Sequence, residues 1–482
     1  MSAARTVECP LRVAARRWPE AAAISSPDRT VSYRELDVRV SGLAAGLRGA
    51  GLPAGSKFGV SMPANEQYLS LVLAALRAGL VVAPVSTRLP AASTVAALRD
   101  VGARAVVSGD PVFLAAAVEA GVVALPPDSL DVAPDASAEM VPRLDLDAPA
   151  TVVFTSGSTG RPKAALHTVG NHRASALGSA RNIPLGPGDA WLHSLPLFHV
   201  GGLSILFRCV LAGATVALPG PGEPLAEAIP RSRATHVSLV STQLRRLLDG
   251  GPVGTALSGL RAVLLGGSAI PADLLDRAHD LGVPVHTSYG LTEMTSQVTT
   301  TRPGASRAEL ATSGRVLPGR EVRISERGEI LVRGETLFAG YLESGRPVRP
   351  LDREGWFGTG DLGNLDTDGR LTVTGRLDNL FVSGGENVQP ERVEEELRRL
   401  PEVEEAIVVP VADREFGERP VAFVRLAPGT PEVRLGGLRE RLRERLAGFE
   451  VPDALYPWPL DAPQGMKVNR AYFKERADER HR

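Results

Sequence analysis

The sequence predicts an α/β protein in which a large N-terminal domain precedes a small, mobile α+β domain. Helix-like and strand-like stretches alternate over residues 31–130 and again over 150–300, which is typical of mainly parallel sheets covered by helices. Residues 310–375 hold short strands punctuated by Gly and Asp, which indicates a small antiparallel β-barrel or sheet. We therefore expect two parallel-type α/β subdomains and a small barrel in the large domain.

The first alternating block contains the clearest elements. Tyr33–Gly51 has helical spacing and ends in Gly, and Lys57–Ser61 is a short apolar strand. Glu66–Ala78 is helical again, and Leu80–Pro84 is expected to be a buried strand. The helix-then-strand order repeats over Ala91–Val107. This alternation predicts the first α/β subdomain.

A connector rich in Pro, Asp and Ala is expected over residues 125–148, before the second block. The barrel that follows that block is expected to contain the strands Glu321–Ile324, Glu329–Val332 and Leu371–Thr374. The C-terminal unit is expected to contain a charged helix that starts at Pro, two strands and a second helix, at Pro390–Leu400, Val403–Val411, Val421–Leu426 and Leu435–Leu446. The predicted domains are therefore 1–376 and 377–482.

Composition excludes several classes of protein. Hydrophobic residues are 43% and charged residues 23% of 482, the balance of an ordinary globular protein. The 54 basic residues nearly cancel the 55 acidic ones, so no bulk field predicts a nucleic-acid partner. The apolar run Leu69–Thr87 is broken by Arg77, so no integral membrane segment is expected. Only Cys9 and Cys209 are present, which fits a reducing compartment and predicts a cytoplasmic protein.

A loop rich in glycine and hydroxyl groups follows the β-branched and aromatic run Thr151–Phe154, which predicts a strand. The loop, Thr155–Lys163, reads TSGSTGRPK. Its glycines let successive backbone N–H groups point at one anion, its hydroxyls add donors, and Lys163 adds a charge. This chemistry suits a triphosphate or pyrophosphate, although no Gly-Lys-Ser/Thr closes a Walker A motif. The predicted phosphate-binding residues are Thr155, Ser156, Gly157, Ser158, Thr159, Gly160 and Lys163.

The loop resembles the phosphate loop of the adenylate-forming superfamily, which comprises acyl- and aryl-CoA synthetases, adenylation domains and luciferases. The resemblance covers roughly residues 10–475, and the motifs fall in the family's order. Ala164 stands where the family usually has Gly. The resemblance implies ATP, Mg²⁺ and CoA as co-substrate, with a small carboxylic acid as the other substrate. It implies a catalytic set of Thr155, His199, Glu293 and Lys467.

Further motifs are similar to the family's nucleotide site. In SYGLTE, residues 288–293, the resemblance implies that Tyr289 stacks on adenine, Thr292 contacts the α-phosphate and Glu293 holds Mg²⁺. A hard cation wants carboxylate oxygen and usually bridges phosphates. The motif GWFGTGD ends at Asp361, which the resemblance places on the two ribose hydroxyls. The other nucleotide-binding residues implied are Gly267, Ser268, Gly290 and Arg376.

The C-terminal motifs resemble those of a domain that rotates. Gly375–Asp378 is similar to the hinge, with Asp378 as the pivot. The next segment resembles a loop that lines the thiol tunnel, which implies CoA contacts from Ser383, Gly384 and Gly385. Lys467 matches the catalytic lysine, although Met466 stands where the family has Gly. It is one of only four lysines, beside 50 arginines.

Segments around the acyl pocket resemble a particular subgroup, the o-succinylbenzoate–CoA ligases of menaquinone biosynthesis. LPLFHVGG, residues 195–202, resembles the pocket motif with His199 at its entrance, and the subgroup resemblance extends through Arg208. One carboxylate of that substrate reacts and the other stays charged, so the pocket needs a cation or several donors. Arg208 is the candidate, with Ser241 and Gln297 as helpers, and a structural ion pair is the alternative for Arg208.

Three other functions stay open at this point. One is a general acyl- or aryl-CoA ligase, and the second is a free-standing amino-acid adenylation enzyme, which needs an acidic partner for the amine. The third is a catalytically dead nucleotide-binding regulator, which the joint presence of Lys163, Glu293, Asp361, Arg376 and Lys467 disfavours. The oligomeric state also stays open, including a homodimer or a higher assembly.

Overall fold

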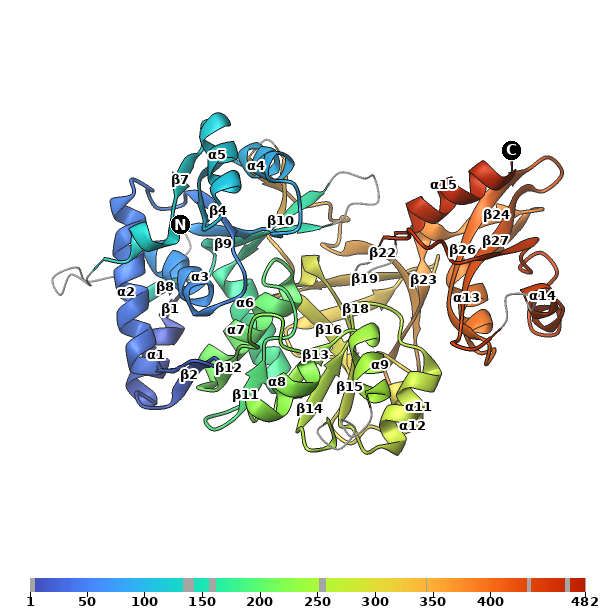
Figure 1. Cartoon of the computed structure of the whole chain (residues 1–482), viewed down its shortest axis with the longest axis horizontal. Helices are drawn as coiled ribbons and strands as arrows, with labels where there is room; N and C mark the ends of the chain where they lie inside the picture. The colour runs from blue at the N-terminus through green and yellow to red at the C-terminus, as the bar shows by residue number, and fades with distance from the viewer. Residues whose placement is uncertain are drawn as a thin grey trace.

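The computed structural model describes residues 5–132, 143–155, 162–250, 257–343, 345–430, 435–463 and 469–481. Figure 1 shows a large body, coloured blue to orange, with a small C-terminal unit at one end of the longest axis. The body contains an eight-stranded, a nine-stranded and a four-stranded sheet, together with the small ribbon β1–β8, and the C-terminal unit contains a fifth sheet. The α/β fold class is therefore confirmed.

The first large sheet has the strand order β21-β20-β10-β9-β5-β4-β6-β7. Five adjacent strands, β9, β5, β4, β6 and the edge strand β7, are parallel, and β10 and β20 continue the sheet in antiparallel pairing. The strands are β4 Lys57–Ser61, β5 Val81–Pro84, β6 Ala103–Ser108, β7 Val123–Leu125, β9 Pro149–Thr155, β10 Lys163–Thr168, β20 Gly340–Glu343 and β21 Arg346–Val348.

The second large sheet has the order β17-β16-β15-β14-β13-β11-β12-β2-β3. Its six central strands are parallel, and β3, β16 and β17 run antiparallel at its edges. The strands are β2 Ala22–Ser25, β3 Thr30–Ser32, β11 Ala190–Leu192, β12 Thr215–Ala217, β13 His236–Leu239, β14 Ala262–Leu265, β15 Val285–Leu291, β16 Ser296–Thr300 and β17 Arg315–Val316.

The helices of the body bury their apolar faces against these sheets, and the largest core joins both sheets through α1, α2, α3 and α7. Every residue of α3 from Tyr68 to Ala78 is buried, which explains its nearly continuous apolar sequence. Asn65 caps its start by accepting from the backbone N–H of Tyr68. The helices are α1 Pro10–Arg17, α2 Tyr33–Gly49, α3 Glu66–Ala78, α4 Ala91–Asp100, α5 Pro111–Glu119, α6 Val169–Ala180, α7 Val200–Ala212, α8 Leu225–Arg231, α9 Ser241–Asp249, α11 Ala272–Asp280 and α12 Arg307–Leu310.

The described ends of the connector expected over 125–148 are more ordered than its composition indicates. It contains the 3₁₀ helix η1 (Pro127–Leu130) and the strand β8 (Arg143–Asp145), which pairs with β1 (Thr6–Glu8). Leu130 and Leu144 are buried in the main core. The composition suggests an exposed connector, which is wrong at its two ends, because Leu130 and Leu144 anchor them in the core. Two isolated leucines form no periodic pattern, so periodicity does not reveal this burial.

The antiparallel region predicted over 310–375 is confirmed as a four-stranded sheet of order β18-β19-β22-β23. Its strands are β18 Arg320–Ile324, β19 Glu329–Gly334, β22 Phe357–Leu365 and β23 Leu371–Arg376. Its core includes Ala165 of β10 and Tyr289 of β15, so it packs against both large sheets.

The C-terminal unit has two hydrophobic clusters built only from its own residues. Its sheet has the order β25-β24-β27-β26, with β28 paired beside β27. The 3₁₀ helix η3 (Leu377–Asn379) leads into it from β23. Its other elements are β24 Phe381–Ser383, β25 Glu386–Val388, α13 Pro390–Arg398, β26 Val403–Asp413, β27 Gly417–Leu426, α14 Leu435–Arg443, β28 Ala454–Pro457 and α15 Arg470–His481. In the described part of the chain, no helix is long and apolar enough to cross a membrane.

Candidate active site

The predicted motifs meet at one edge of the second large sheet. The parallel strands β11, β13, β14 and β15 end side by side. The segments after the first three carry the pocket motif, Ser241 and Gly267, and the SYGLTE motif covers the end of β15 and the turn after it. Ligands of open α/β sheets bind outside the carboxyl ends of the strands. Gly267 and Ser268 are exposed after β14. A Cβ on Gly290 would lie 2.2 Å from the carbonyl oxygen of Ser296, so the close approach of β15 and β16 requires glycine.

A chain of hydrogen bonds joins the predicted nucleotide residues from three strands. The Tyr289 hydroxyl donates to Asp361 Oδ2 at 2.6 Å, and Arg376 Nη1 donates to Asp361 Oδ1 at 2.8 Å. Arg376 Nη2 then donates to Asp378 Oδ2 at 2.9 Å, which reaches the predicted pivot. Burial, and next the neighbouring Asp361 carboxylate, raise the pKa of Tyr289 well above its ordinary value. The phenol therefore stays protonated and acts as a donor.

Tyr341 joins the two charged groups that are predicted to face the phosphates, and sequence analysis did not name it. Its hydroxyl donates to Glu293 Oε1, and its ring lies 5.1 Å from Lys163 Nζ, measured to the ring centroid. It stands on β20, opposite Ala165 of β10, so the pairing of these strands places it beside Lys163. Burial, and next the charge of Glu293, raise the pKa of Tyr341. A tyrosine in a glycine-flanked strand was the available signal, and it is weak.

Glu293 can contribute to a Mg²⁺ site only together with the substrate. Among the residues that the structure describes, no three His, Cys, Asp or Glu side chains gather closely enough to hold a metal ion. Tyr341 engages one carboxylate oxygen of Glu293. Mg²⁺ is usually held by one or two carboxylates and by substrate phosphates, and one available carboxylate beside a phosphate lysine fits that pattern.

Replacement of Glu293 by Gln is expected to raise the Mg²⁺ concentration for half-maximal pyrophosphate release at least 10-fold, because a neutral amide is a weaker ligand for a hard cation. A Mg²⁺ titration at saturating ATP measures this. Glu343→Gln, an exposed change on the strand of Tyr341, is the control and should behave as the unaltered chain. An unchanged Mg²⁺ requirement in the Glu293 variant would remove this residue from the metal site.

Two buried histidines connect the phosphate-loop hairpin to the turn that carries Glu293. His167 on β10 donates from Nε2 to the Thr292 carbonyl oxygen at 2.7 Å. Thr151 Oγ1 lies 2.9 Å from His172 Nε2 and 3.4 Å from His167 Nδ1. Burial lowers the pKa of His167 to about 4 and that of His172 well below its ordinary value. Both rings are therefore neutral at pH 7.

Stability is expected to fall as pH drops from about 6.5 toward 4. Burial lowers the pKa values of His167 and His193 from 6.5 to about 4 in the folded chain, so the unfolded chain binds more protons in this window. The loss is about 1.4 kcal/mol per pH unit for each such histidine. Chemical denaturation between pH 7.5 and pH 4.5 measures it. A His167→Gln variant should show a shallower slope, and an unchanged slope would contradict the assignment.

Of the other acyl-pocket candidates, Gln297 contacts Arg208 on α7. The Arg208 side chain is 4% exposed, and its Nη2 donates to Gln297 Oε1 at 2.7 Å. Its guanidinium lies 5.0 Å from the Trp191 ring, measured to the ring centroid, and its buried Nε has no hydrogen-bond partner. Among the described residues no carboxylate lies within ion-pair distance of Arg208, so this part of the chain supplies no partner for a structural ion pair. Burial lowers its pKa to about 10, so it stays charged.

Three other predicted residues, His199, Ser241 and Thr155, contact groups other than Arg208. His199 precedes α7 and packs against Phe198 with the ring centroids 4.7 Å apart. No hydrogen bond joins Ser241 to Arg208 in the described structure, and Ser241 donates instead to the Ala269 carbonyl at 3.1 Å. Thr155 ends β9, and its hydroxyl lies 3.4 Å from the Lys163 carbonyl oxygen.

In the C-terminal unit, Ser383 is fully buried and accepts from Arg419 Nη1 at 3.1 Å. Gly384 and Gly385 form the turn between β24 and β25. The predicted residues that lie outside the described residues are Ser156, Gly157, Ser158, Thr159, Gly160 and Lys467.

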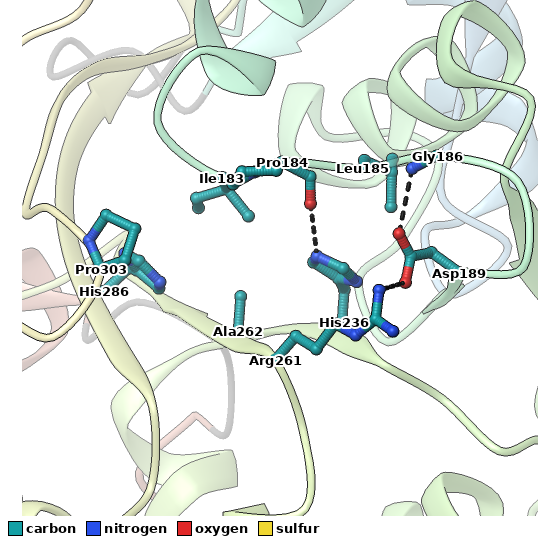
Figure 2. Close-up of a pocket in the computed structure, with 10 residues that line it drawn as sticks. All are labelled: Ile183, Pro184, Leu185, Gly186, Asp189, His236, Arg261, Ala262, His286 and Pro303. Carbon is teal, nitrogen blue, oxygen red and sulfur yellow. Dashed lines mark hydrogen bonds and ion pairs between the residues drawn. The ribbon is translucent and has the colours of Figure 1, made fainter.

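A cavity of about 410 Å³ opens at the other edge of the second large sheet (Figure 2). Its wall contains His236, Ala262 and His286, which stand at the starts of β13, β14 and β15. Asp189 accepts from Arg261 beside it. Because the predicted motifs follow the carboxyl ends of the same strands, this cavity is separate from them.

Comparison with known proteins decides the family. The model of the AMP-binding enzyme matches residues 11–342, and that of the AMP-binding enzyme C-terminal domain matches residues 392–461. The chain belongs to the AMP-binding enzyme family. Within this family it is 39% identical to the 2-succinylbenzoate–CoA ligase of Salmonella typhimurium over 95% of this chain and 96% of that one.

Two solved structures of one synthetase share the whole fold. One is the o-succinylbenzoate CoA synthetase (MenE) from Bacillus subtilis in complex with the acyl-adenylate intermediate OSB-AMP, which is 31% identical with a TM-score of 0.88 and covers 97% of this chain and 98% of that chain. The other is the same synthetase in complex with ATP and magnesium ion, which is 31% identical with a TM-score of 0.85 and covers 97% and 99%. The match includes the C-terminal unit, since nearly all of both chains is covered.

Proposed function

We propose that the chain is an ATP-dependent acid–CoA ligase that converts 2-succinylbenzoate to 2-succinylbenzoyl-CoA. Its identity of 39% to a 2-succinylbenzoate–CoA ligase supports this substrate. The single structural observation that carries it is Arg208, a buried guanidinium in the acyl-pocket segment with no carboxylate partner among the described residues. A buried cation of this kind is compensated when an anion binds beside it. The ring carboxylate of the substrate supplies that anion.

The reaction needs two chemical steps. A carboxylate is a poor electrophile because its charge is delocalised and its leaving group would be oxide. Attack of the succinyl carboxylate on the α-phosphorus of ATP forms an acyl-adenylate and releases pyrophosphate. A thiolate of CoA then attacks the acyl carbon, and AMP leaves with the electron pair of the broken C–O bond.

The first step brings two anions together, so positive charge must be arranged beforehand. Lys163 stands at the end of the phosphate loop for the leaving phosphates, and Glu293 would hold Mg²⁺, which supplies charge to the phosphate oxygens when bound. Lys467 would bridge the carboxylate and the AMP oxygens. Preorganised charge of this kind is usually the largest single term in catalysis.

The nucleoside would be held by the chain of bonds at Asp361. Its carboxylate accepts from Tyr289 and Arg376 in this structure, which fixes its orientation. The two ribose hydroxyls would compete for the same oxygens, so binding of ATP exchanges the Tyr289 bond for ribose bonds and leaves the tyrosine ring beside the adenine. Arg376 remains as the positive partner of Asp361.

The second step requires Lys467 to leave and the thiol to enter, and rotation of the unit 377–482 about Asp378 would exchange them. This unit has hydrophobic clusters of its own, which favours movement as one body. The Arg376–Asp378 ion pair at 2.9 Å crosses the proposed pivot. Asp378 is half-exposed there, so its backbone can turn without disturbing a core.

We also propose a cytoplasmic location, which the two free cysteines support.

A panel of carboxylic acids tests the proposal by pyrophosphate release with and without CoA. We expect 2-succinylbenzoate to give the highest kcat/KM, and octanoate and benzoate to give at least 100-fold less. The thioester should form only when CoA is present. A preference for a monoacid would overturn the substrate, and release with an amino acid alone would support an adenylation enzyme instead.

A further inference from the structure

Arg320, the first residue of β18, is a second buried guanidinium near the acyl pocket, and nothing above assigns it a function. It is 5% exposed. Its Nε donates to the Gln297 carbonyl oxygen at 2.6 Å, Nη1 to the Pro318 carbonyl at 2.8 Å, and Nη2 to the Ser175 carbonyl at 3.2 Å. In the described part of the chain no carboxylate lies within ion-pair distance, so its charge has only neutral partners.

The fold makes room for this side chain. A Cβ on Gly178 of α6 would lie 2.1 Å from Arg320 Nη1, so the guanidinium occupies space that any other residue at 178 would take. Transfer of an unpaired charge from water into a protein interior is costly, and an apolar side chain could fill the same volume without that cost. A buried charge at this position, despite its cost, indicates that its positive electrostatic potential has a function, such as binding of an anion.

Gln297 connects the two buried cations. Its backbone carbonyl accepts from Arg320 Nε at 2.6 Å, and its side-chain Oε1 accepts from Arg208 Nη2 at 2.7 Å. Its Nε2 donates to Thr300 Oγ1 at 2.7 Å, which fixes the amide orientation. Burial, and next the charge of Arg208, lower the pKa of Arg320 to about 9, so both guanidiniums are charged at pH 7. Two positive charges therefore converge on one residue of the pocket.

We propose that Arg320 is a specificity-determining positioning residue, which acts through Gln297 and together with Arg208 to select acids that carry a second carboxylate. Arg208 contacts that carboxylate. Arg320 fixes the Gln297 backbone through its hydrogen bond to the carbonyl oxygen, and its charge adds positive electrostatic potential at the site of that carboxylate. The inference rests on the proposed function and extends it to a residue outside the pocket wall.

A purely structural role, satisfying three carbonyl groups, makes a different prediction. Loss of such bonds would disturb binding of every acid equally. Loss of potential at the ring carboxylate would affect the diacid and spare benzoylpropanoate, which is the same molecule without its ring carboxylate. The comparison of these two acids therefore separates the two roles.

The experiment measures KM and kcat for both acids by pyrophosphate release, using Arg320→Gln and Arg320→Lys. For Arg320→Gln we expect the KM for 2-succinylbenzoate to rise at least 10-fold, with the KM for benzoylpropanoate changed less than 2-fold. Arg320→Lys keeps the charge and should restore most of the loss. Arg323→Gln, a change at a half-exposed position on the same strand, is the matched control. Equal changes for the two acids, or no rescue by Lys, would overturn the role of Arg320.

A second variant keeps the proposal testable if Arg320→Gln does not fold. Gln297→Glu places a carboxylate beside Arg208 Nη2, on the residue whose backbone carbonyl Arg320 contacts, which should raise the Tm and remove the preference for the diacid. An unchanged preference would overturn the proposal. If the unaltered chain showed no preference for 2-succinylbenzoate over benzoylpropanoate, the proposed substrate would be wrong. If it showed the preference and the variants kept it, only the role of Arg320 would be wrong.

Discussion

Lys467→Ala is expected to lower adenylate formation about 10²–10³-fold, the usual effect of losing one preorganised donor, and to leave thioester formation from supplied acyl-adenylate within 3-fold. In the proposed mechanism, Lys467 is needed only while the carboxylate and the α-phosphate react, and rotation of the C-terminal unit removes it before the thiol enters. Pyrophosphate release measures the first step. Chromatography of the thioester formed from synthetic acyl-adenylate and CoA measures the second.

Lys474→Ala is the matched control for this prediction. Lys474 is close in sequence, stands on α15 and donates to the Pro410 carbonyl at 3.0 Å. Its loss should leave both steps unchanged, because it lies outside the resemblance motif. Equal loss of both steps in the Lys467 variant would contradict the proposal that one site catalyses the two steps in turn, with Lys467 present only in the first.

Arg208→Met is expected to lower kcat/KM for 2-succinylbenzoate about 10²–10³-fold, because under the proposed function the substitution leaves the buried ring carboxylate without its charged partner, which costs about 3–5 kcal/mol. Turnover of benzoylpropanoate should stay within about 3-fold. Steady-state kinetics with both acids measures the difference. Arg208→Lys keeps the charge but loses the guanidinium geometry, and should be intermediate.

The stability of the same variant gives an independent check. Without substrate, Arg208 is a buried cation that donates only to the neutral groups of Gln297 and Ser296 among the described residues, and its Nε is unsatisfied. Replacement by a residue of similar volume removes that desolvation cost, so the Tm of Arg208→Met should be unchanged or higher. A large fall in Tm together with equal loss for both acids would show that Arg208 is structural.

Local elements follow from local patterns. The strand Lys57–Ser61 and the helix Glu66–Ala78 have the predicted bounds, because apolar spacing and the flanking cap residues act within a few positions. Helix ends were less exact, since α2 ends at Gly49 rather than Gly51 and α14 at Arg443 rather than Leu446. The last turn depends on contacts that the local sequence does not carry.

By itself, the sequence determined the α/β class, the order of the motifs and the chemistry of each motif, because glycines, hydroxyls and carboxylates act through their own atoms. Only the tertiary structure decided which of these groups share partners. Tyr341 reached Glu293 through pairing of β20 with β10, and Arg320 reached Gln297 from another sheet. Such contacts join positions far apart in the chain, where register and packing, rather than neighbouring residues, set the distance between charges.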